Sequence, residues 1–189
     1  MDKNLIEEGV RLILKGIGED INREGLKRTP QRVAEMYEEL FSGIGKDPTL
    51  ELKPLFDENH DEMIIVKDIP FYSVCEHHLV PFVGKAHIAY VPNKSGKIVG
   101  LSKLTRVLEI VSRRLQVQER LTTIVADAIM NQLEPRGVMV IIEAEHLCMS
   151  IRGVKKPNTI TVTSAVRGLF RQNPASRAEA MSLIKSDRK

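Results

Sequence analysis

Residues 82–91 read Phe-Val-Gly-Lys-Ala-His-Ile-Ala-Tyr-Val, and this segment decides the fold class. Its larger apolar side chains share one face of an extended chain: Phe82, Ala86, Ile88 and Tyr90. Lys85 and His87 fall on the other face, because successive side chains of a β-strand point to opposite sides. This alternation is typical of a strand that packs one face against a core.

Further strands and several helices are predicted on both sides of this segment. β-rich runs predict strands over residues 63–69, 138–145 and 159–166, and Pro70 is expected to end the first. Apolar spacing predicts helices over residues 4–16, 102–115, 117–133 and 175–185, and from Thr29 to about Gly43. Thr29-Pro30 reads as an N-cap followed by proline at the first helical position. Residues 46–60 read as a loop.

The order of these elements indicates the fold class. Two helices, two strands, two helices, two strands and a final helix favour an α+β fold with an antiparallel sheet. Helices on one face of such a sheet leave the other face in need of cover, which oligomerisation could supply. We expect an N-terminal helical arm and linker over residues 1–60 and the sheet-bearing domain over residues 61–189.

The composition is that of an ordinary globular protein. The chain has 189 residues, of which 42% are hydrophobic and 28% charged. No apolar run approaches the length of a membrane span, and the N-terminal residues lack the pattern of a signal peptide. We therefore expect a cytoplasmic protein, in which a Cys75–Cys148 disulfide would be disfavoured. A net charge of +3 does not by itself indicate nucleic acid as a partner.

Two short clusters contain both cysteines of the chain: Cys75-Glu76-His77-His78 and His146-Leu147-Cys148. Thiolate and imidazole ligands at these spacings suit zinc. Three protein ligands, such as Cys75, His78 and Cys148, would leave a fourth position for water, as in catalytic zinc sites. The remaining imidazoles, His77 and His146, would then be available for proton transfer.

Spacing alone does not decide which histidines are ligands. His146 and Cys148 lie two apart at the end of a predicted strand, so both should point to one face. The alternative is that the cysteines are buried thiols and the histidines make ordinary hydrogen bonds. Glu76 can be a carboxylate that orients a ligand or a solvated surface residue.

The segment Gly100-Leu101-Ser102-Lys103-Leu104-Thr105-Arg106 opens a helix with cations in its first turn. Ser102 is expected to be the N-cap. Lys103 and Arg106 oppose the helix dipole, an objection that disappears if a phosphate binds there. A solvated basic face is the alternative. Arg152, with Lys155 and Lys156, adds cations near the predicted metal.

Glu119 lies near the start of the next predicted helix, where the helix dipole alone would favour a carboxylate. It could instead accept two parallel hydrogen bonds from N1–H and the 2-amino group of a guanine. The sequence does not choose between these interpretations.

Motifs along nearly the whole chain occur in the order found in one enzyme family: Arg23-Glu24-Gly25-Leu26, Thr29-Pro30-Gln31-Arg32-Val33, Cys75-Glu76-His77-His78, Gly84-Lys85-Ala86, Gly100-Leu101-Ser102-Lys103, Gln118-Glu119-Arg120-Leu121-Thr122, His146-Leu147-Cys148-Met149, Arg152-Gly153-Val154 and Gly168-Leu169-Phe170. Together they resemble GTP cyclohydrolase I, a zinc-dependent family of hydrolases at the head of folate and pteridine biosynthesis. The resemblance implies a tunnelling fold (T-fold), in which four-stranded antiparallel sheets join into a barrel, with two rings stacked as a homodecamer. Active sites would lie at subunit interfaces.

The resemblance also implies the ligands and the reaction. Cys75, His78 and Cys148 would hold Zn²⁺, while His77 and His146 stay free as catalytic groups. GTP and water would give 7,8-dihydroneopterin triphosphate and formate through opening of the guanine imidazole ring. The implied substrate contacts are Gln118, Glu119, Ser102, Lys103, Arg106 and Arg152, with Arg32 from a neighbouring subunit. Glu35 stands where some members have a basic residue, so no triphosphate contact is assigned to it.

Two other functions are compatible with parts of the pattern. A nitrile reductase of queuosine biosynthesis has the same fold, but it uses a cysteine nucleophile and a nicotinamide cofactor and would not require the zinc ligands. A zinc-stapled nucleic-acid-binding module is the non-enzymatic alternative. Aromatic residues make up only 4% of the chain and none lies among the cations of residues 102–106, so base-stacking platforms are missing. We therefore expect no nucleic-acid partner and no membrane partner.

Overall fold

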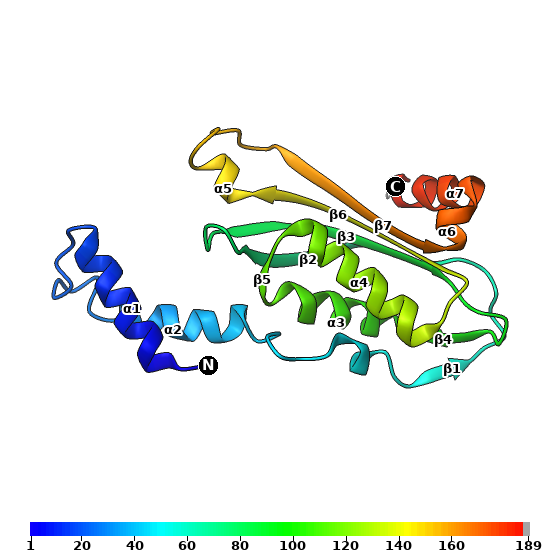
Figure 1. The fold of residues 1–189 in the computed structure, drawn as a ribbon, viewed down its shortest axis with the longest axis horizontal. Helices are drawn as coiled ribbons and strands as arrows, with labels where there is room; N and C mark the ends of the chain where they lie inside the picture. Colours follow the sequence, from blue (N-terminus) through cyan, green and yellow to red (C-terminus); the bar gives the residue numbers. More distant parts are fainter. Residues whose placement is uncertain (187–189) are drawn as a thin grey trace.

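A curled sheet of mainly antiparallel strands forms the centre of the body in this computed structural model, which describes residues 1–186 (Figure 1). The strands are β1 (Leu55–Asp57), β2 (Ile64–Cys75), β3 (Pro81–Val91), β4 (Lys97–Val99), β5 (Leu115–Gln116), β6 (Gly137–His146) and β7 (Ile160–Gly168). The helices are α1 (Lys3–Gly16), α2 (Thr29–Leu40), the 3-10 helix η1 (Pro48–Glu51), α3 (Leu101–Ser112), α4 (Gln118–Leu133), α5 (Leu147–Ser150), α6 (Leu169–Gln172) and α7 (Pro174–Lys185). The α+β class predicted from the element order is confirmed.

The main sheet has the order β5-β2-β3-β6-β7. Its four long strands are antiparallel, as expected, and the short β5 adds a parallel pair to the end of β2. The register pairs Phe82 with His146 and Val74 with Pro81. The end of β2, the start of β3 and the end of β6 therefore lie side by side at one end of the strands. Both predicted metal-binding clusters lie at this end of the sheet.

Pro70 does not end the first long strand, contrary to the sequence prediction. β2 continues to Cys75, and Pro70 pairs with Lys85 of β3. On its other side β2 pairs with β5, at Val74 and Cys75. Within the described residues, Pro70 thus lies where that edge has no partner strand, so the missing proline N–H breaks no ladder hydrogen bond.

The main core lies between the sheet and the helices α3 and α4. Phe82, Ala86, Ile88 and Tyr90 are buried there, as their alternation predicted. α3 ends at Ser112, earlier than expected, because Leu115 and Gln116 leave the helix to pair with β2.

The other face of the sheet is partly covered by the chain itself. Ala89, Met139 and Ile141 form a second core with Phe170 of α6 and Ala180 of α7. Helices therefore cover both faces of the sheet and not one alone, because the chain folds back after β7 (Figure 1).

The N-terminal helices α1 and α2 pack on each other and project beyond the sheet (Figure 1). The segment expected to be a loop between them and the sheet contains η1 and β1, and β1 pairs with β4. Leu52 is fully buried in the main core, so this linker is anchored to the body. The division at residue 60 stays a prediction.

Candidate metal and catalytic site

A pocket of about 230 Å³ lies at the end of the sheet where β2 and β6 end. Most of the predicted site residues line it: Cys75, His77, His78, Gln118, Glu119, His146 and Cys148. They come from three segments far apart in sequence, namely the end of β2, the start of α4 and the end of β6 with α5. The strand register described above is what brings them together.

Cys75, His78 and Cys148 form a possible metal-binding group, since one ligand atom from each lies within 4.8 Å of the others. The Cys75 Sγ and His78 Nδ1 atoms are 3.9 Å apart. Both cysteines are free thiols. Burial and the neighbouring Cys75 sulfur raise the pKa of the Cys148 thiol, so a metal must displace a proton there. Two thiols and an imidazole with this spacing fit a zinc ion, whose bonds are about 2.0–2.3 Å long.

Cys148 reaches this group by a route that the sequence did not indicate. β6 ends at His146, and Cys148 is the second residue of the short helix α5. The expectation that His146 and Cys148 share one face of a continuing strand is therefore wrong. The chain turns into a helix there, and the turn brings the Cys148 thiol to Cys75.

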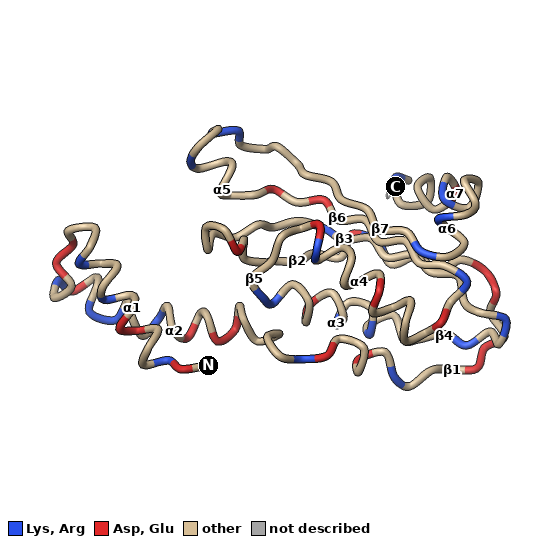
Figure 2. The backbone as a smooth tube through the Cα atoms, viewed as in Figure 1, with Lys and Arg blue, Asp and Glu red and all other residues tan. Residues whose placement is uncertain are grey.

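Arg152 lies just beyond α5 and contacts a predicted ligand. Its Nη1 atom is 2.8 Å from Nε2 of His78. Lys155 and Lys156 follow in the same loop, and Figure 2 shows the loop after α5 as a basic segment at the metal-binding end of the sheet. Arg152, which was predicted to lie near the metal, is therefore beside the possible metal-binding group of its own chain.

His146 is held on two sides. Its Nε2 atom lies 2.7 Å from Oε1 of Gln118, and its ring stacks on Phe82 with centroids 4.7 Å apart and planes 3° apart. Burial lowers the pKa of His146, although the nearby Glu119 carboxylate acts in the opposite direction. A neutral imidazole, able to accept a proton, is thus favoured.

Gln118 is buried behind His146. Its amide binds His146, two backbone carbonyls and Thr163, so it supports His146 from behind. Its expected contact with the substrate stays a prediction. Glu119 lines the pocket and is exposed. It makes no hydrogen bond or ion pair to a described residue, and its carboxylate is available to a ligand.

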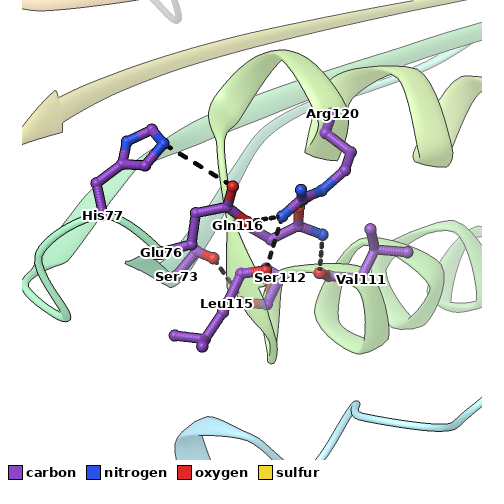
Figure 3. Close-up of polar contacts among 8 residues, drawn as sticks. All are labelled: Ser73, Glu76, His77, Val111, Ser112, Leu115, Gln116 and Arg120. Atoms are coloured by element: carbon purple, nitrogen blue, oxygen red, sulfur yellow. Dashed lines mark hydrogen bonds and ion pairs between the residues drawn. The ribbon is translucent and has the colours of Figure 1, made fainter.

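His77 is exposed, and a polar network that the sequence analysis missed lies behind it (Figure 3). Arg120 donates hydrogen bonds to Glu76, to the Leu115 carbonyl oxygen at 3.0 Å and to Oε1 of Gln116 at 3.0 Å. The guanidinium lowers the pKa of Glu76, whose carboxylate lies 3.9 Å from Nε2 of His77. Arg120 thereby joins α4, β5 and the metal-binding loop.

The first turn of α3 is not part of this pocket. Ser102, Lys103 and Arg106 lie at the start of α3, whereas the end of α3 faces the site: the Ser73 hydroxyl, two residues before Cys75, donates to the Ser112 carbonyl oxygen at 2.7 Å. Ten residues of helix separate Ser102 from Ser112, about 15 Å. Lys103 and Arg106 instead lie 3.9 and 3.6 Å from Glu51.

The structure contradicts one further prediction about the start of α3, while the contact expected from Arg32 of a neighbouring subunit stays a prediction. Ser102 is not the N-cap, because the helix begins at Leu101 after Gly100, and Ser102 makes no side-chain capping bond. Arg32 lies on α2 in the projecting arm and does not line the pocket. Neighbouring Glu35 accepts a hydrogen bond from Gln31 at 2.8 Å.

Comparison with known proteins places the chain in one family. Residues 6–185 match the family model described as GTP cyclohydrolase I. A GTP cyclohydrolase 1 from Pelotomaculum thermopropionicum is 65% identical over 97% of this chain and 97% of its own length. Relatives of the same name from Carboxydothermus hydrogenoformans and Clostridioides difficile are each 62% identical over 97% of this chain, covering 95% and 97% of their own lengths. Matches of this extent show that the chain belongs to the GTP cyclohydrolase I family.

Proposed function

We propose that this chain opens the imidazole ring of the guanine in GTP by hydrolysis, releases formate and forms 7,8-dihydroneopterin triphosphate. One observation carries the proposal. Three residues that suit zinc share one pocket with two histidines outside that group, His77 and His146, and with the Glu119 carboxylate. The family membership of the chain supports the same reaction.

We infer that Cys75, His78 and Cys148 hold a zinc ion. Their donor set of two thiols and one imidazole suits zinc, and three ligands leave one position open toward the pocket. A bound zinc ion would lower the pKa of a coordinated water to about 7 and so supply a nucleophile near neutral pH.

Glu119 would bind the guanine. Its exposed carboxylate lines the pocket and can accept parallel hydrogen bonds from N1–H and the 2-amino group. Adenine has neither donor at these positions, so it would leave the carboxylate underpaired, and sites of this kind discriminate strongly. Gln118 would contribute through His146 and not by touching the base.

His77 and His146 would move the protons that ring opening and sugar rearrangement require. His146 is oriented by Gln118 and partly buried, and burial lowers its pKa, which favours the neutral imidazole that a base requires. His77 is exposed and lies beside the Glu76 carboxylate that Arg120 holds. Each of these imidazoles lines the pocket while His78 belongs to the metal group.

The triphosphate contacts would come from two copies of the chain. Arg152 lies at the pocket, but Ser102, Lys103 and Arg106 lie at the far end of α3. We propose a homo-oligomer, namely the decamer of two stacked rings that the resemblance to the family implies. In it a neighbouring copy would bring its α3 start and its Arg32 to this pocket. The edge of β7 and the part of the β2 edge that β5 leaves unpaired have no partner strand among the described residues, which suits such joining.

Incubation of zinc-loaded protein with GTP tests the proposal. We expect release of formate and a pterin product that fluoresces after oxidation, with neither product from ATP. Chelation of the metal should abolish both signals, and added zinc should restore them. Zinc-free protein with full activity, or zinc-loaded protein that leaves GTP unchanged, would show that the proposed function is wrong.

No helix of the described residues is long and apolar enough to cross a membrane. We propose a cytoplasmic location, as the sequence led us to expect.

A further inference from the structure

Gln118 is buried, with 1% of its surface exposed, and its amide joins three elements around His146. The Nε2 atom of Gln118 lies 3.0 Å from the Ile142 carbonyl oxygen on β6 and 3.0 Å from the Thr161 carbonyl oxygen on β7. Its Oε1 atom lies 2.7 Å from Nε2 of His146. The side chain thus bridges the start of α4 to both strands behind the pocket.

These contacts fix which way the amide points. A backbone carbonyl oxygen can only accept a hydrogen bond, so the two carbonyls require the NH₂ group of Gln118 on their side. A flipped amide would set an oxygen against two carbonyl oxygens in a buried site, at the cost of unpaired acceptors. The amide oxygen must therefore face His146.

A chain of hydroxyl groups beside the amide agrees with this orientation. The Thr122 hydroxyl donates to the backbone carbonyl oxygen of Gln118 at 2.7 Å, and the hydroxyls of Thr122 and Thr163 are 2.6 Å apart. Thr163 must donate in that pair, because Thr122 has already used its proton. Its oxygen can then only accept from Nε2 of Gln118, at 3.1 Å.

The amide orientation in turn assigns the proton of His146. Because Oε1 of Gln118 can only accept, Nε2 of His146 must be the donor and must carry hydrogen. In a neutral imidazole Nδ1 is then the bare nitrogen with a lone pair. No described residue donates a hydrogen bond to it, and the stacked Phe82 ring fixes the plane in which it lies.

We propose that Gln118 is a positioning residue that holds His146 in the Nε2–H tautomer, with Nδ1 as the atom that accepts a proton. The tautomer is inferred from the hydrogen bonds alone. The reaction in which Nδ1 would accept a proton rests on the proposed function. When Nδ1 accepts a proton, the Nε2–H bond to Gln118 persists, and the amide oxygen stabilises the cation. Gln118 thereby favours transfer of a proton to Nδ1 of His146, and it does so through His146 and not through a contact with the substrate.

Two measurements test the proposal. Neutron diffraction from the zinc-loaded protein, exchanged into D₂O at neutral pH, should place deuterium on Nε2 of His146. A kinetic comparison uses Gln118→Met, which keeps side-chain length but removes the amide. We expect kcat with GTP to fall roughly 10- to 100-fold, because His146 would lose the hydrogen-bond partner that orients it and stabilises its cation, while KM changes less than about twofold.

Gln132→Met is the matched control, because Gln132 lies on the same helix but not at the pocket. It should keep the kinetics of the unchanged protein. Deuterium on Nδ1 with a bare Nε2 would overturn the proposal, as would a Gln118→Met protein whose KM rises while kcat holds, since Gln118 would then be a substrate contact. If Gln118→Met does not fold, the diffraction result still decides. Absence of formate from GTP would count against the proposed function, whereas the tautomer is read independently of turnover.

Discussion

In a single chain the residues of the pocket at the end of the sheet lie together, whereas the first turn of α3 lies away from them. The sequence predicted that these two regions form one site. The pocket gathers segments up to seventy residues apart, because antiparallel register places the ends of β2 and β6 beside each other. The α3 start is a local motif, and it lies about 15 Å along the helix from Ser112, at the end of α3 that faces the pocket. We therefore propose that one chain supplies the metal-binding and proton-transfer groups, and that a second chain supplies most of the phosphate-binding groups.

The largest expected effect tests this division directly. Cys148→Ser should lose zinc and activity, and the double variant Lys103→Ala with Arg106→Ala should retain zinc but turn over GTP poorly. Oligomers that contain both variants should regain part of the activity, because some interfaces combine an intact pocket with an intact α3 start. Formate release from co-expressed, purified mixtures measures the gain.

A mixture of Cys148→Ser with His146→Ala is the control for this experiment. Both changes damage the same pocket, so no interface can combine two intact halves and no gain is expected. If the first mixture also fails to regain activity although mixed oligomers form, the two halves belong to one chain and the comparison between them is wrong.

Within the pocket, His146→Ala should separate metal binding from proton transfer. The metal group does not include His146, so zinc content should stay at the level of the unchanged protein. Loss of a general acid or base lowers the rate by about 10²- to 10⁴-fold. Zinc analysis beside the formate assay measures both, and a His146→Ala protein without zinc would show that the ligand assignment is wrong.

The sequence predicted the members of the pocket better than their geometry. Spacing and the family motifs named the three residues of the possible metal-binding group, the two other histidines of the pocket and Glu119, because chemistry restricts the residue types at such positions. The α5 turn at Cys148 and the continuation of β2 through Pro70 were missed. Both depend on which strand edges are paired, and that is a property of the tertiary structure.

The role of Arg120 shows the same limit. Its contact with Glu76 joins residues 44 apart and forms because β5 pairs with the end of β2. No spacing rule connects these residues. Gln118 lies in a family motif, and the motif suggested the substrate contact, whereas the buried carbonyls of Ile142 and Thr161 are visible only in the folded chain.

At the α3 start, Arg106→Ala should weaken substrate binding without touching the metal. A hydrogen bond to a charged group contributes about 1.5–3 kcal/mol, so KM for GTP should rise at least about tenfold. Zinc content should be unchanged. Arg171→Ala, on α6 away from the α3 start, is the control and should leave KM as it is. An unchanged KM in Arg106→Ala would remove this arginine from the triphosphate site.

A smaller effect is expected on stability from the network behind the pocket. Arg120→Met would leave the oxygen of buried Gln116 and the Leu115 carbonyl oxygen without their donor, at a cost of about 1–3 kcal/mol in the free energy of unfolding. Urea unfolding measures it. Arg120→Lys keeps the charge but not the fork of donors, so it should fall between the two proteins. Equal stability of all three would show that the network does not support the metal-binding loop.

The smallest expected effect concerns pH and a histidine remote from both halves of the site. His87 is buried on the second face of the sheet, and its Nδ1 atom accepts a hydrogen bond from the Asp68 N–H at 3.2 Å. Burial lowers the pKa of His87 from its ordinary value of 6.5; Glu143 and Asp68 act to raise it, and Lys85 and Lys67 act to lower it. Because the unfolded chain takes up this proton first, the folded state loses stability as pH falls below the ordinary value toward the lowered one.

His87→Gln can keep an acceptor for the Asp68 N–H but cannot titrate. Its free energy of unfolding should therefore fall less than that of the unchanged protein when the pH is lowered from about 7 to about 5.5, across the ordinary histidine pKa. Urea unfolding at both pH values gives the difference. The loss should be smaller than the effect of Arg120→Met, because a single proton is involved and nearby carboxylates offset part of the burial. An equal acid-side loss in both proteins would show that groups other than His87 cause it.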